Sequence, residues 1–542
     1  MGFLPAEILT RRVLVAALFA VGIFFRVYAL DRIPLPIYQD ALSNVYDAYS
    51  IVETGADRWG SPRPIIVRAF GENDYRPAMM VWLTTLPVKV LGFSTLAARA
   101  ASAILGCLSL FLIFALARRM AGPAFATIAL AFAALSPWLI SDARVGHEGA
   151  SLAPLFFILI LYLWHRAAEK EYALSWTLVV GFVTGFSSNA YQTTRLIGPL
   201  LLGMMLVEVL RTRRKVDRVT VALVGSALIG AAPQIAVFVT GRDRFFARAA
   251  ETVVSGSGPI DTILEILSGF AANFGPRYLF WPDMTEAFLT TARLLPVEVL
   301  FLPLGLLTLA RMSGWKLPRF RWYLYAALVV AVLPAALTNQ NPHSLRAASA
   351  AVLFPFFSAA GVLAVHRWAK SRPGWELSAR LLVPASIAGS FVFVLYMYIE
   401  GRAVRGLRMQ NAMVQAATKV DRYDERYDKV FIADHGLHPY LYYVAFTGMT
   451  PVQFQKAPKQ VYSLRGWDVV RRVGKFYFRT DSELVAEAAQ PMTSRSRNLF
   501  VSRVPLEGSR MIDSVALHWD KYYIADFPSK GSALIATPDA RH

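Results

Sequence analysis

Long apolar runs separated by short polar loops occupy most of the chain up to residue 399. A run of about 20 apolar residues is long enough to cross a hydrocarbon core of ~30 Å as a helix. Such runs lie at residues 12–30, 97–118, 122–140, 150–165, 173–189, 194–210, 217–240, 292–311, 320–338, 345–366 and 379–399. The pattern therefore predicts a polytopic α-helical membrane protein with about 11 transmembrane helices.

The segment 77–92 is also apolar, but it is short and contains Pro87 and Lys89. If it does not cross, the loops rich in Lys and Arg all fall on the side of the N-terminus, which is then cytoplasmic by the positive-inside rule. These basic loops lie at residues 118–119, 166–170, 211–218, 311–321 and 367–380. We therefore predict that 77–92 is an interfacial or re-entrant helix in the first extracytoplasmic loop.

The pattern changes at Glu400, where charged residues become frequent and the apolar runs shorten to strand length. KVFIA, KFYFR, NLFVSRV and YYIADF are runs of this kind, and turn residues separate them. We predict a transmembrane domain at 1–399 and a small soluble α/β domain at 400–542. Eleven spans from a cytoplasmic N-terminus place the second domain on the extracytoplasmic, periplasmic side of an inner (plasma) membrane.

The composition agrees with a membrane protein and argues against several other classes of protein. The chain has 542 residues, of which 55 % are hydrophobic and only 17 % charged. The formal charge of +19 reflects the basic loops, so it does not indicate a nucleic-acid partner. Cys107 is the single cysteine, so no internal disulfide can form. The absence of a Gly-rich phosphate loop argues against a nucleotide-driven pump.

The first extracytoplasmic loop contains an expected amphipathic helix. Between Ala41 and Val52 the apolar residues fall at spacings of three and four, which is typical of a helix lying along a membrane surface. Asp40 is expected to be its N-cap. That structural role alone would account for an aspartate here, so the other polar loops decide how Asp40 is interpreted.

Polar side chains recur in the loops on the extracytoplasmic side. They include Asp40, Asp47, Asp74 and Arg76 in the first loop, Arg144, His147 and Glu148 after the third span, Tyr191 and Arg195 after the fifth, and His343 and Arg346 after the ninth. Arginines beside span ends, on the face where basic residues are scarce, indicate an anionic ligand at headgroup depth. A lipid-linked phosphate fits, because guanidinium groups pair with its oxygens and a carboxylate could act as general base on an incoming hydroxyl.

These segments resemble a known family. YQDALSNVYDAYSIVETGADRWG, then YRPAMMVWLTTLPVKVLGFSTLAARAASAILG, then LSPWLISDARVGHEG are similar in order and kind to the C-type membrane glycosyltransferases. Within that superfamily they are most similar to the bacterial relatives of protein O-mannosyltransferases and of the lipid A aminoarabinose transferase. The resemblance covers about residues 12–210, and the NPHSLRA loop more loosely. It implies an inverting transfer of a hexose or pentose from a polyprenyl-phosphate-linked donor to a glycan, lipid or protein acceptor.

The resemblance also implies residue roles. Asp40 takes the position of the catalytic base and Arg76 that of the basic residue before proline that contacts the lipid phosphate. The donor phosphate or sugar is then expected at Arg76, Arg144, Glu148, Tyr191, Arg195, His343 and Arg346. Two departures stand out: the family's Asp-Glu is Asp40-Ala41 here, and its Lys-Pro-Pro is Arg76-Pro77-Ala78. Asp47 or Glu148 could substitute for the missing glutamate, and Asp47 and Asp74 are the expected secondary acids.

Three alternatives stay open at this point. A transporter or flippase of a lipid-linked sugar would also need arginines facing phosphate, although the middles of the predicted spans are nearly free of charge, unlike transporter sites. A scaffolding protein would leave the acidic first loop unexplained. His147 and Glu148, with His343, could bind a divalent metal, but adjacent His and Glu are a weak signal and no metal cofactor is assigned.

Overall fold

The computed structural model describes residues 6–33, 37–281, 292–372, 375–399, 408–436, 438–489, 497–517 and 520–527. The chain forms two compact units. Unit 1 comprises residues 1–35, 64–69 and 73–406, and unit 2 comprises residues 36–63, 70–72 and 407–542. The division expected from the sequence did not anticipate that a segment of the first loop packs with the C-terminal part of the chain.

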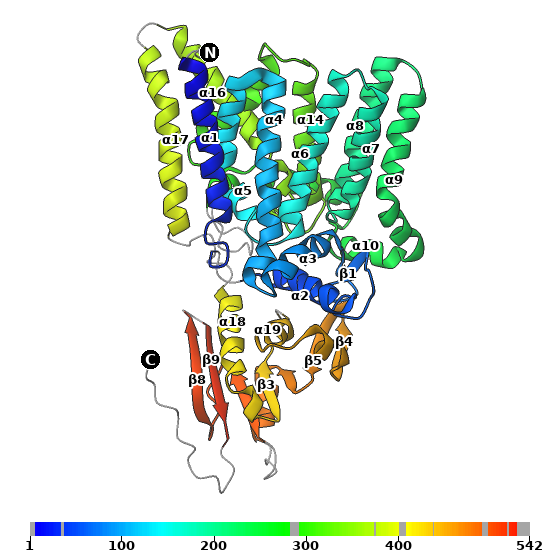
Figure 1. The fold of residues 1–542 in the computed structure, drawn as a ribbon, viewed down its shortest axis with the longest axis vertical. Coiled ribbons are helices and arrows are strands. Elements are labelled where there is room, and N and C mark those ends of the chain that lie inside the picture. The colour runs from blue at the N-terminus through cyan, green and yellow to red at the C-terminus, as the bar shows by residue number, and fades with distance from the viewer. Residues whose placement is uncertain are drawn as a thin grey trace. The chain divides into compact units, whose positions relative to one another are not determined.

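Unit 1 is a bundle of roughly parallel helices (Figure 1). The helices that run along the bundle are α1 (Ala6–Val27), α4 (Thr95–Leu135), α6 (Glu148–Glu169), α7 (Leu174–Phe186), α8 (Thr194–Arg213), α9 (Arg218–Thr240), α13 (Glu298–Thr308), α14 (Phe320–Ala336), α16 (Phe354–Lys370) and α17 (Glu376–Ile399). The long α4 is two helices joined at Gly122, which has φ 86° and is followed by Pro123. A left-handed residue before proline breaks the helix, so the chain can reverse there.

The smaller elements of unit 1 lie in its loops. They are the hairpin β1 (Ile66–Arg68) and β2 (Tyr75–Pro77), then α3 (Met79–Leu91), α5 (Pro137–Asp142), α10 (Arg242–Thr252), α11 (Pro259–Ala272), α12 (Pro276–Phe280) and α15 (Ala348–Ala351), with short 3₁₀ turns at Ser187–Asn189 and Leu309–Arg311. Helix α3 occupies the segment predicted as interfacial or re-entrant. Its 13 residues extend over roughly 20 Å, which is short of a membrane crossing.

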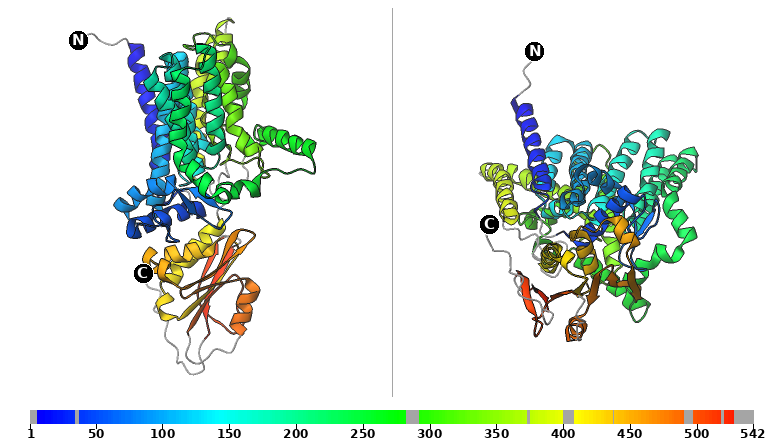
Figure 2. Two further views of the ribbon diagram at one scale, coloured as in Figure 1. Left: turned by 90° about the vertical axis from the view of Figure 1, so that its right-hand side faces the viewer. Right: turned by 60° about the horizontal axis from the view of Figure 1, so that its bottom comes forward.

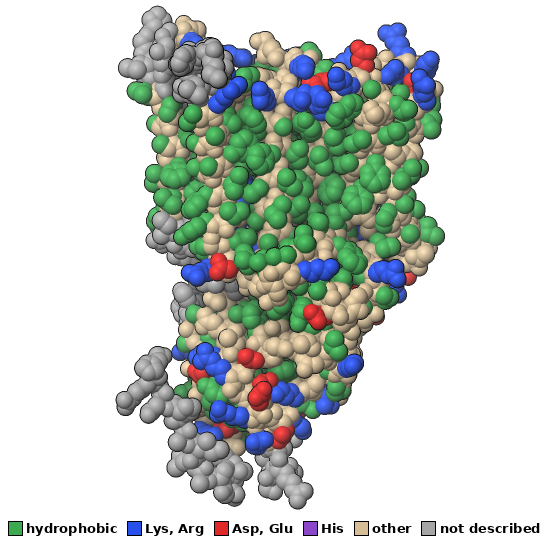
Figure 3. All heavy atoms as spheres, in the orientation of Figure 1, with side chains coloured by type: hydrophobic (Ala, Val, Ile, Leu, Met, Phe, Trp, Pro, Cys, Tyr) green, Lys and Arg blue, Asp and Glu red, His purple; other side chains and the backbone are tan. Residues whose placement is uncertain are grey.

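Each of the eleven predicted spans contains a helix among the described residues. Four helices are long and apolar enough to cross a membrane unaided, at Thr95–Leu135, Glu148–Glu169, Arg218–Thr240 and Ala348–Lys370. The count of eleven crossings stays a prediction. Figure 3 shows a broad band of hydrophobic side chains on the visible face of unit 1, with Lys and Arg side chains gathered along one end of it.

The basic loops at residues 118–119, 166–170, 211–218 and 311–321 lie close together, since Arg119 and Lys316 pair with Glu169 and Arg213 donates to the Glu171 carbonyl. Glu169 joins three of these loops through ion pairs to Arg119 (3.1 Å), Arg166 (2.8 Å) and Lys316 (2.9 Å). The Glu169 side chain is only 4 % exposed, so its charge needs these partners.

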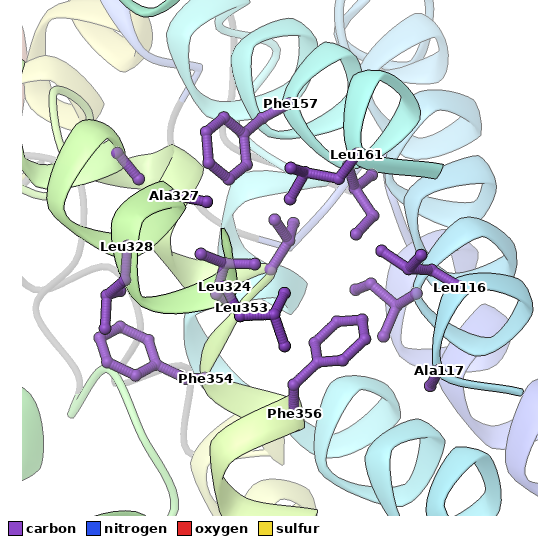
Figure 4. Close-up of a cluster of buried hydrophobic side chains, with 14 of the residues drawn as sticks. Leu116, Ala117, Phe157, Leu161, Leu324, Ala327, Leu328, Leu353, Phe354 and Phe356 are labelled. Carbon is purple, nitrogen blue, oxygen red and sulfur yellow. The ribbon is translucent and has the colours of Figure 1, made fainter. Parts of the chain in front are cut away.

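The core of unit 1 is formed where α4, α6, α14 and α16 meet (Figure 4). Helix α16 also approaches α13 closely at two glycines. A Cβ built on Gly305 would lie 1.7 Å from the Phe357 carbonyl oxygen, and one on Gly361 would lie 1.9 Å from that of Phe301. Small residues at such crossings let backbones approach, which is a main source of helix association in membranes.

Unit 2 contains a seven-stranded mixed sheet in the order β4-β5-β6-β3-β7-β9-β8. The strands are β3 (Lys429–Ala433), β4 (Lys459–Leu464), β5 (Trp467–Val473), β6 (Phe476–Arg479), β7 (Asn498–Ser502), β8 (Arg510–Leu517) and β9 (Asp520–Asp526). Strands β6, β3 and β7 are parallel, and the other neighbouring pairs are antiparallel. The four strands predicted from KVFIA, KFYFR, NLFVSRV and YYIADF are therefore present.

Helices cover both faces of this sheet (Figure 2). They are α18 (Arg408–Asp421), α19 (Pro439–Phe446), α20 (Pro451–Lys456) and α21 (Asp481–Ala489). Leu484 of α21 packs with Phe431 and Phe500 on one face. Tyr443 of α19 meets Phe478, which is paired in register with Ile432, on the other face. Successive side chains of β3 therefore point to opposite faces of the sheet, as the alternation of side chains along a strand requires.

The amphipathic helix of the first loop is α2 (Gln39–Thr54), and it belongs to unit 2. It packs against α19 and α20: Tyr46 Oη donates to the Met449 carbonyl at 3.0 Å, and Gln455 Nε2 donates to Ser50 Oγ at 3.1 Å. The prediction that Asp40 is the N-cap is wrong. The N-cap residue is Tyr38, and Asp40 lies within the first turn, where a carboxylate still interacts favourably with the helix dipole.

Candidate active site

Arg76 lies on the β1–β2 hairpin of unit 1, where it is paired in register with Val67. Its Nε donates to Asp74 Oδ1 at 3.0 Å and its Nη2 to Asp74 Oδ2 at 2.5 Å. This bidentate pair fixes the plane of the guanidinium group. Asp74, predicted as a secondary acid, therefore holds Arg76 in place.

The head of helix α6 supplies a second carboxylate to Arg76. Glu148 Oε1 lies 3.6 Å from Arg76 Nη1, and the Glu148 side chain is 1 % exposed. His147 precedes it as the N-cap of α6, and its Nδ1 accepts a hydrogen bond from the Gly149 amide at 2.8 Å. The other Glu148 oxygen lies 3.8 Å from His147 Nδ1. The SDARVGHEG loop and the first loop thus meet at these charged groups.

Tyr191 adds a hydroxyl group to the same cluster. Its ring packs edge-on against the His147 ring, with centroids 5.6 Å apart. A Cβ on Gly149 would lie 2.7 Å from a Tyr191 ring carbon, so only glycine permits this approach without displacing the ring. Burial, reinforced by the charge of Glu148, raises the pKa of Tyr191 to about 12. The hydroxyl therefore stays protonated and can donate a hydrogen bond.

The NPHSLRA loop supplies Arg346 and His343. Arg346 is 8 % exposed, and its Nη2 donates to Gln340 Oε1 at 3.2 Å. The charges of Arg346 and Arg76 oppose the rise in the pKa of Tyr191, which places both guanidinium groups within electrostatic reach of its hydroxyl. Burial and the Arg346 charge lower the pKa of His343 to about 3. His343 is therefore neutral at neutral pH and cannot contribute charge to phosphate binding.

Two further arginines belong to this cluster. The charges of Arg248 and Arg293 also lower the pKa of His343, after burial, Arg346 and His147. Arg293 is fully buried and lies over the Tyr278 ring at 4.3 Å. Sequence reasoning missed Arg293 because it falls inside the predicted span 292–311. A lone arginine in an apolar span was itself a signal of function.

Arg144 and Arg195, both predicted donor-binding residues, are engaged elsewhere. Arg144 donates to four backbone carbonyls at the end of α1 and just after it, those of Phe25, Tyr28, Ala29 and Ile33, at 2.7–3.2 Å. Arg195 donates to the Phe245 carbonyl at 2.8 Å and to Gln234 Oε1 at 2.9 Å. These bonds favour structural roles, with Arg144 capping α1 and Arg195 joining α8 to α9 and α10.

The candidate metal ligands His147 and Glu148 both have other partners. Nδ1 of His147 already accepts the Gly149 amide, and Glu148 faces the positive charge of Arg76. Among the residues that the structure describes, no group of three or more His, Cys, Asp or Glu side chains is arranged to hold an ion.

The two acids of α2 lie in unit 2. Asp40 is 4 % exposed, and its charge adds to burial in raising the pKa of Tyr442. Asp47 is committed to Arg58: its Oδ2 lies 3.2 Å from Arg58 Nη1, and its Oδ1 accepts the Arg58 amide at 3.1 Å. Both side chains are essentially fully buried. These contacts favour a structural role for Asp47 over the predicted role of secondary acid.

In unit 1 the structure thus brings together five predicted residues from loops that are far apart in sequence. They are Arg76, Glu148, Tyr191, His343 and Arg346, and Asp74 and His147 contact them directly. We call this set, with Arg248 and Arg293, the arginine cluster. A buried cluster of this kind, with several guanidinium groups and few carboxylates, is suited to bind a phosphate.

Comparisons with known proteins show what this chain is similar to. Residues 75–237 match the family model of dolichyl-phosphate-mannose-protein mannosyltransferase. The crystal structure of ArnT from Cupriavidus metallidurans bound to undecaprenyl phosphate is similar over 96 % of this chain and 99 % of that chain, with 14 % identity and a TM-score of 0.54. The apo ArnT structure covers 98 % and 100 %, with 12 % identity and a TM-score of 0.55.

A third neighbour is the archaeal oligosaccharyltransferase AglB from Archaeoglobus fulgidus in complex with an inhibitory peptide and a dolichol-phosphate. It is similar over 81 % of this chain and 63 % of that chain, with 12 % identity and a TM-score of 0.47. None of the curated proteins matches the chain by sequence. The family match includes Arg76, Glu148 and Tyr191, and the ArnT-like fold extends over nearly the whole chain, so the resemblance seen in the sequence is confirmed. The chain is thus similar to the C-type membrane glycosyltransferases, through a family match over residues 75–237 and an ArnT-like fold over nearly its whole length.

Proposed function

We propose that the protein transfers a sugar from a polyprenyl-phosphate-linked donor to a hydroxyl group of an extracytoplasmic glycan, lipid or protein, with inversion at the anomeric carbon. The acceptor oxygen bonds to the anomeric carbon while the bond from that carbon to the phosphate oxygen breaks. The acceptor proton moves to a carboxylate, and the polyprenyl phosphate leaves as an anion that needs no proton. One general base and a set of arginines are therefore sufficient.

The observation that carries this proposal is the burial and hydrogen bonding of Arg346. Its guanidinium group is buried, and its Nη1 has no hydrogen-bond partner among the described residues. A buried charged donor without a partner is costly, so such a group commonly marks the place of a ligand. A phosphate oxygen would satisfy it, and the charges of both Arg346 and Arg76 act on the Tyr191 hydroxyl.

ArnT supports the choice of lipid, because its structure was solved with undecaprenyl phosphate bound. In this chain the arginine cluster would hold the phosphate of the donor and then of the leaving group. Asp74 would keep Arg76 oriented, and the neutral His343 would contribute hydrogen bonding only.

Asp40 is proposed as the general base for the acceptor hydroxyl. The N-cap of α2 is Tyr38, so the helix does not need the Asp40 side chain as a cap. Replacement by Asn keeps the shape and removes the charge. The effect of that change on turnover therefore reports chemistry more than helix stability.

Binding of undecaprenyl phosphate to the protein in lipid nanodiscs tests the phosphate site. Arg346→Ala should weaken binding by about tenfold or more, and Arg346→Lys by less, because charge-assisted hydrogen bonds to a buried group contribute about 1.5–3 kcal/mol. Arg242→Ala is the matched control, since Arg242 is an exposed arginine at the start of α10. Equal affinity in Arg346→Ala and Arg242→Ala would refute the proposed site.

Asp40→Asn tests the base. Membranes carrying this variant should transfer radiolabelled sugar from polyprenyl phosphate to their acceptors at least about 10² times more slowly than the parent, because general bases contribute roughly 10²–10⁴-fold. The variant should still bind undecaprenyl phosphate. Transfer at close to the parental rate would rule out Asp40 as the base.

A further inference from the structure

Unit 2 contains a cavity of about 550 Å³, within the range of ~300–1,000 Å³ typical of small-molecule sites. It lies between the loop that follows β3 and the β4–β5 hairpin. Because β5 runs antiparallel to β6, and β6 is parallel to β3, the start of β5 lies at the edge where β3 ends. In open α/β sheets the carboxyl ends of parallel strands are the usual place for ligands.

Aromatic rings form one wall of this cavity. His438 stacks on Phe70, with ring centroids 4.3 Å apart and planes 16° apart. The Trp467 and Tyr440 rings, which also line the cavity, each lie 6.5 Å from the His438 ring. Trp467 is a lining residue of the cavity and is partly exposed.

Charged groups of both signs complete the lining. They are the carboxylates of Asp434 and Asp468 and the guanidinium group of Arg465. Asp434 directly follows β3, and its Oδ1 accepts the Gly436 amide at 2.9 Å. The opposed charges favour neither a phosphate nor a strongly cationic peptide as the occupant.

Two of the cavity residues have a strained backbone. Arg465 forms the two-residue turn of the β4–β5 hairpin with Gly466, at φ 52° and 81°, and His438 has φ 51°. A left-handed conformation disfavours any residue with a Cβ, and such positions cluster at functional sites. Asn or Gly would form this turn more easily, so the presence of Arg465 there is consistent with a role for its side chain.

We propose that this cavity binds a neutral sugar unit of a glycan, and that the glycan is the acceptor. A sugar ring presents an apolar C–H face and a rim of hydroxyl groups. The Trp467 face can cover the apolar side, and the carboxylates and guanidinium group can pair with the hydroxyls. Glycan binding itself does not depend on the proposed function, but the assignment of the bound glycan as acceptor rests on it.

The first loop connects this cavity to the arginine cluster along the chain. The Asp468 amide donates to the Phe70 carbonyl at 2.9 Å, and a Cβ on Gly71 would lie 2.4 Å from the Gly466 carbonyl oxygen. Phe70 and Gly71 therefore pack tightly on the hairpin turn beside the cavity. Asp74 and Arg76 follow within the same loop. The hairpin turn beside the cavity therefore packs on the same loop that carries Arg76.

Binding of the full-length protein, in fluorescently labelled nanodiscs, to an array of neutral oligosaccharides tests the inference. We expect the parent to bind a defined subset and Trp467→Ala to bind that subset about tenfold or more weakly, the loss expected for one aromatic face. Trp467→Phe should keep most of the binding, whereas Asp434→Asn should weaken it without changing the cavity's shape. Tyr462→Ala, which removes an exposed aromatic on the same hairpin, should bind like the parent.

Two outcomes would overturn the inference: no binding to any glycan by the parent, or equal binding by the parent, Trp467→Ala and Asp434→Asn. Competition by an oligolysine peptide that displaces bound glycan would assign the cavity to basic peptides instead. Arg346→Ala should lose undecaprenyl phosphate yet keep glycan binding. Failure of the cavity assignment is therefore distinguishable from failure of the proposed donor site.

Discussion

Replacing Asp47 by Asn tests whether this buried acid of α2 stabilises unit 2 or takes part in the chemistry. The carboxylate and the Arg58 guanidinium group lie 3.2 Å apart with side chains 1 % and 0 % exposed, and Arg58 also donates to Ser43 Oγ at 2.8 Å. Removing one partner of a buried ion pair typically costs about 3–5 kcal/mol, because the other charge stays buried. Asn keeps an oxygen for the Arg58 amide, so we expect about 3 kcal/mol, or ~10² in the local folding equilibrium.

The double variant Asp47→Asn with Arg58→Met separates the two roles. Removing both charges leaves no unpaired ion, so the double variant should be more stable than the sum of the single changes predicts by about 2 kcal/mol or more. Hydrogen exchange of α2 peptides in the full-length protein measures local stability, and sugar transfer per folded molecule measures activity. If the role of Asp47 is structural, the double variant should recover both the local stability of α2 and the sugar transfer per folded molecule.

A clear experimental result would refute the structural interpretation of Asp47. If Asp47→Asn kept parental protection of α2 but lost sugar transfer, and the double variant did not recover it, Asp47 would be a chemical residue. Additive stability changes in the cycle would likewise show that the Asp47–Arg58 contact contributes little energy.

Three further predictions address other parts of the chain. Arg76→Ala should raise the concentration of donor needed for half-maximal transfer, with Arg76→Lys intermediate, whereas an unchanged requirement would move the phosphate to the other arginines. Gly305→Ala should lower the thermal unfolding temperature in detergent, since its Cβ would collide with the Phe357 carbonyl; Gly225→Ala, which meets nothing within 4 Å, is the control and should leave it unchanged or raise it. Reporters fused after His542 and inserted at residues 211–218 should be extracytoplasmic and cytoplasmic respectively, and finding both on one side would contradict the assigned topology.

The elements of this fold are largely predictable because local patterns encode them. Every predicted span contains a helix, and the predicted strands of unit 2 form its sheet, since apolar runs and their lengths depend on neighbouring residues only. The membership of α2 in unit 2 was not predictable in this way. Its contacts, such as Tyr46 with Met449, join residues from distant parts of the chain.

The N-cap of α2 is a second feature that the sequence did not predict correctly. An aspartate before an apolar period is a strong sign of an N-cap, but the helix begins two residues earlier than predicted, at Gln39, with Tyr38 as its N-cap. Cap assignments from sequence are uncertain by a residue or two, and the difference changes the role of Asp40 from a cap to a side chain that the helix does not require.

Three arginines of unit 1 show why the residues that bind the phosphate could not be identified from the sequence alone. In sequence Arg144, Arg195 and Arg346 are equivalent, since each lies beside a predicted span on the face where basic residues are scarce. Their roles are decided by what accepts their N–H groups. Arg144 donates to four backbone carbonyls, and Arg195 donates to one backbone carbonyl and to the Gln234 side chain; backbone acceptors have no side-chain signature in the sequence. Arg346 donates from Nη2 to the Gln340 side chain, and its buried Nη1 is unsatisfied by the described residues, so a terminal N–H group of Arg346 can donate to an anion.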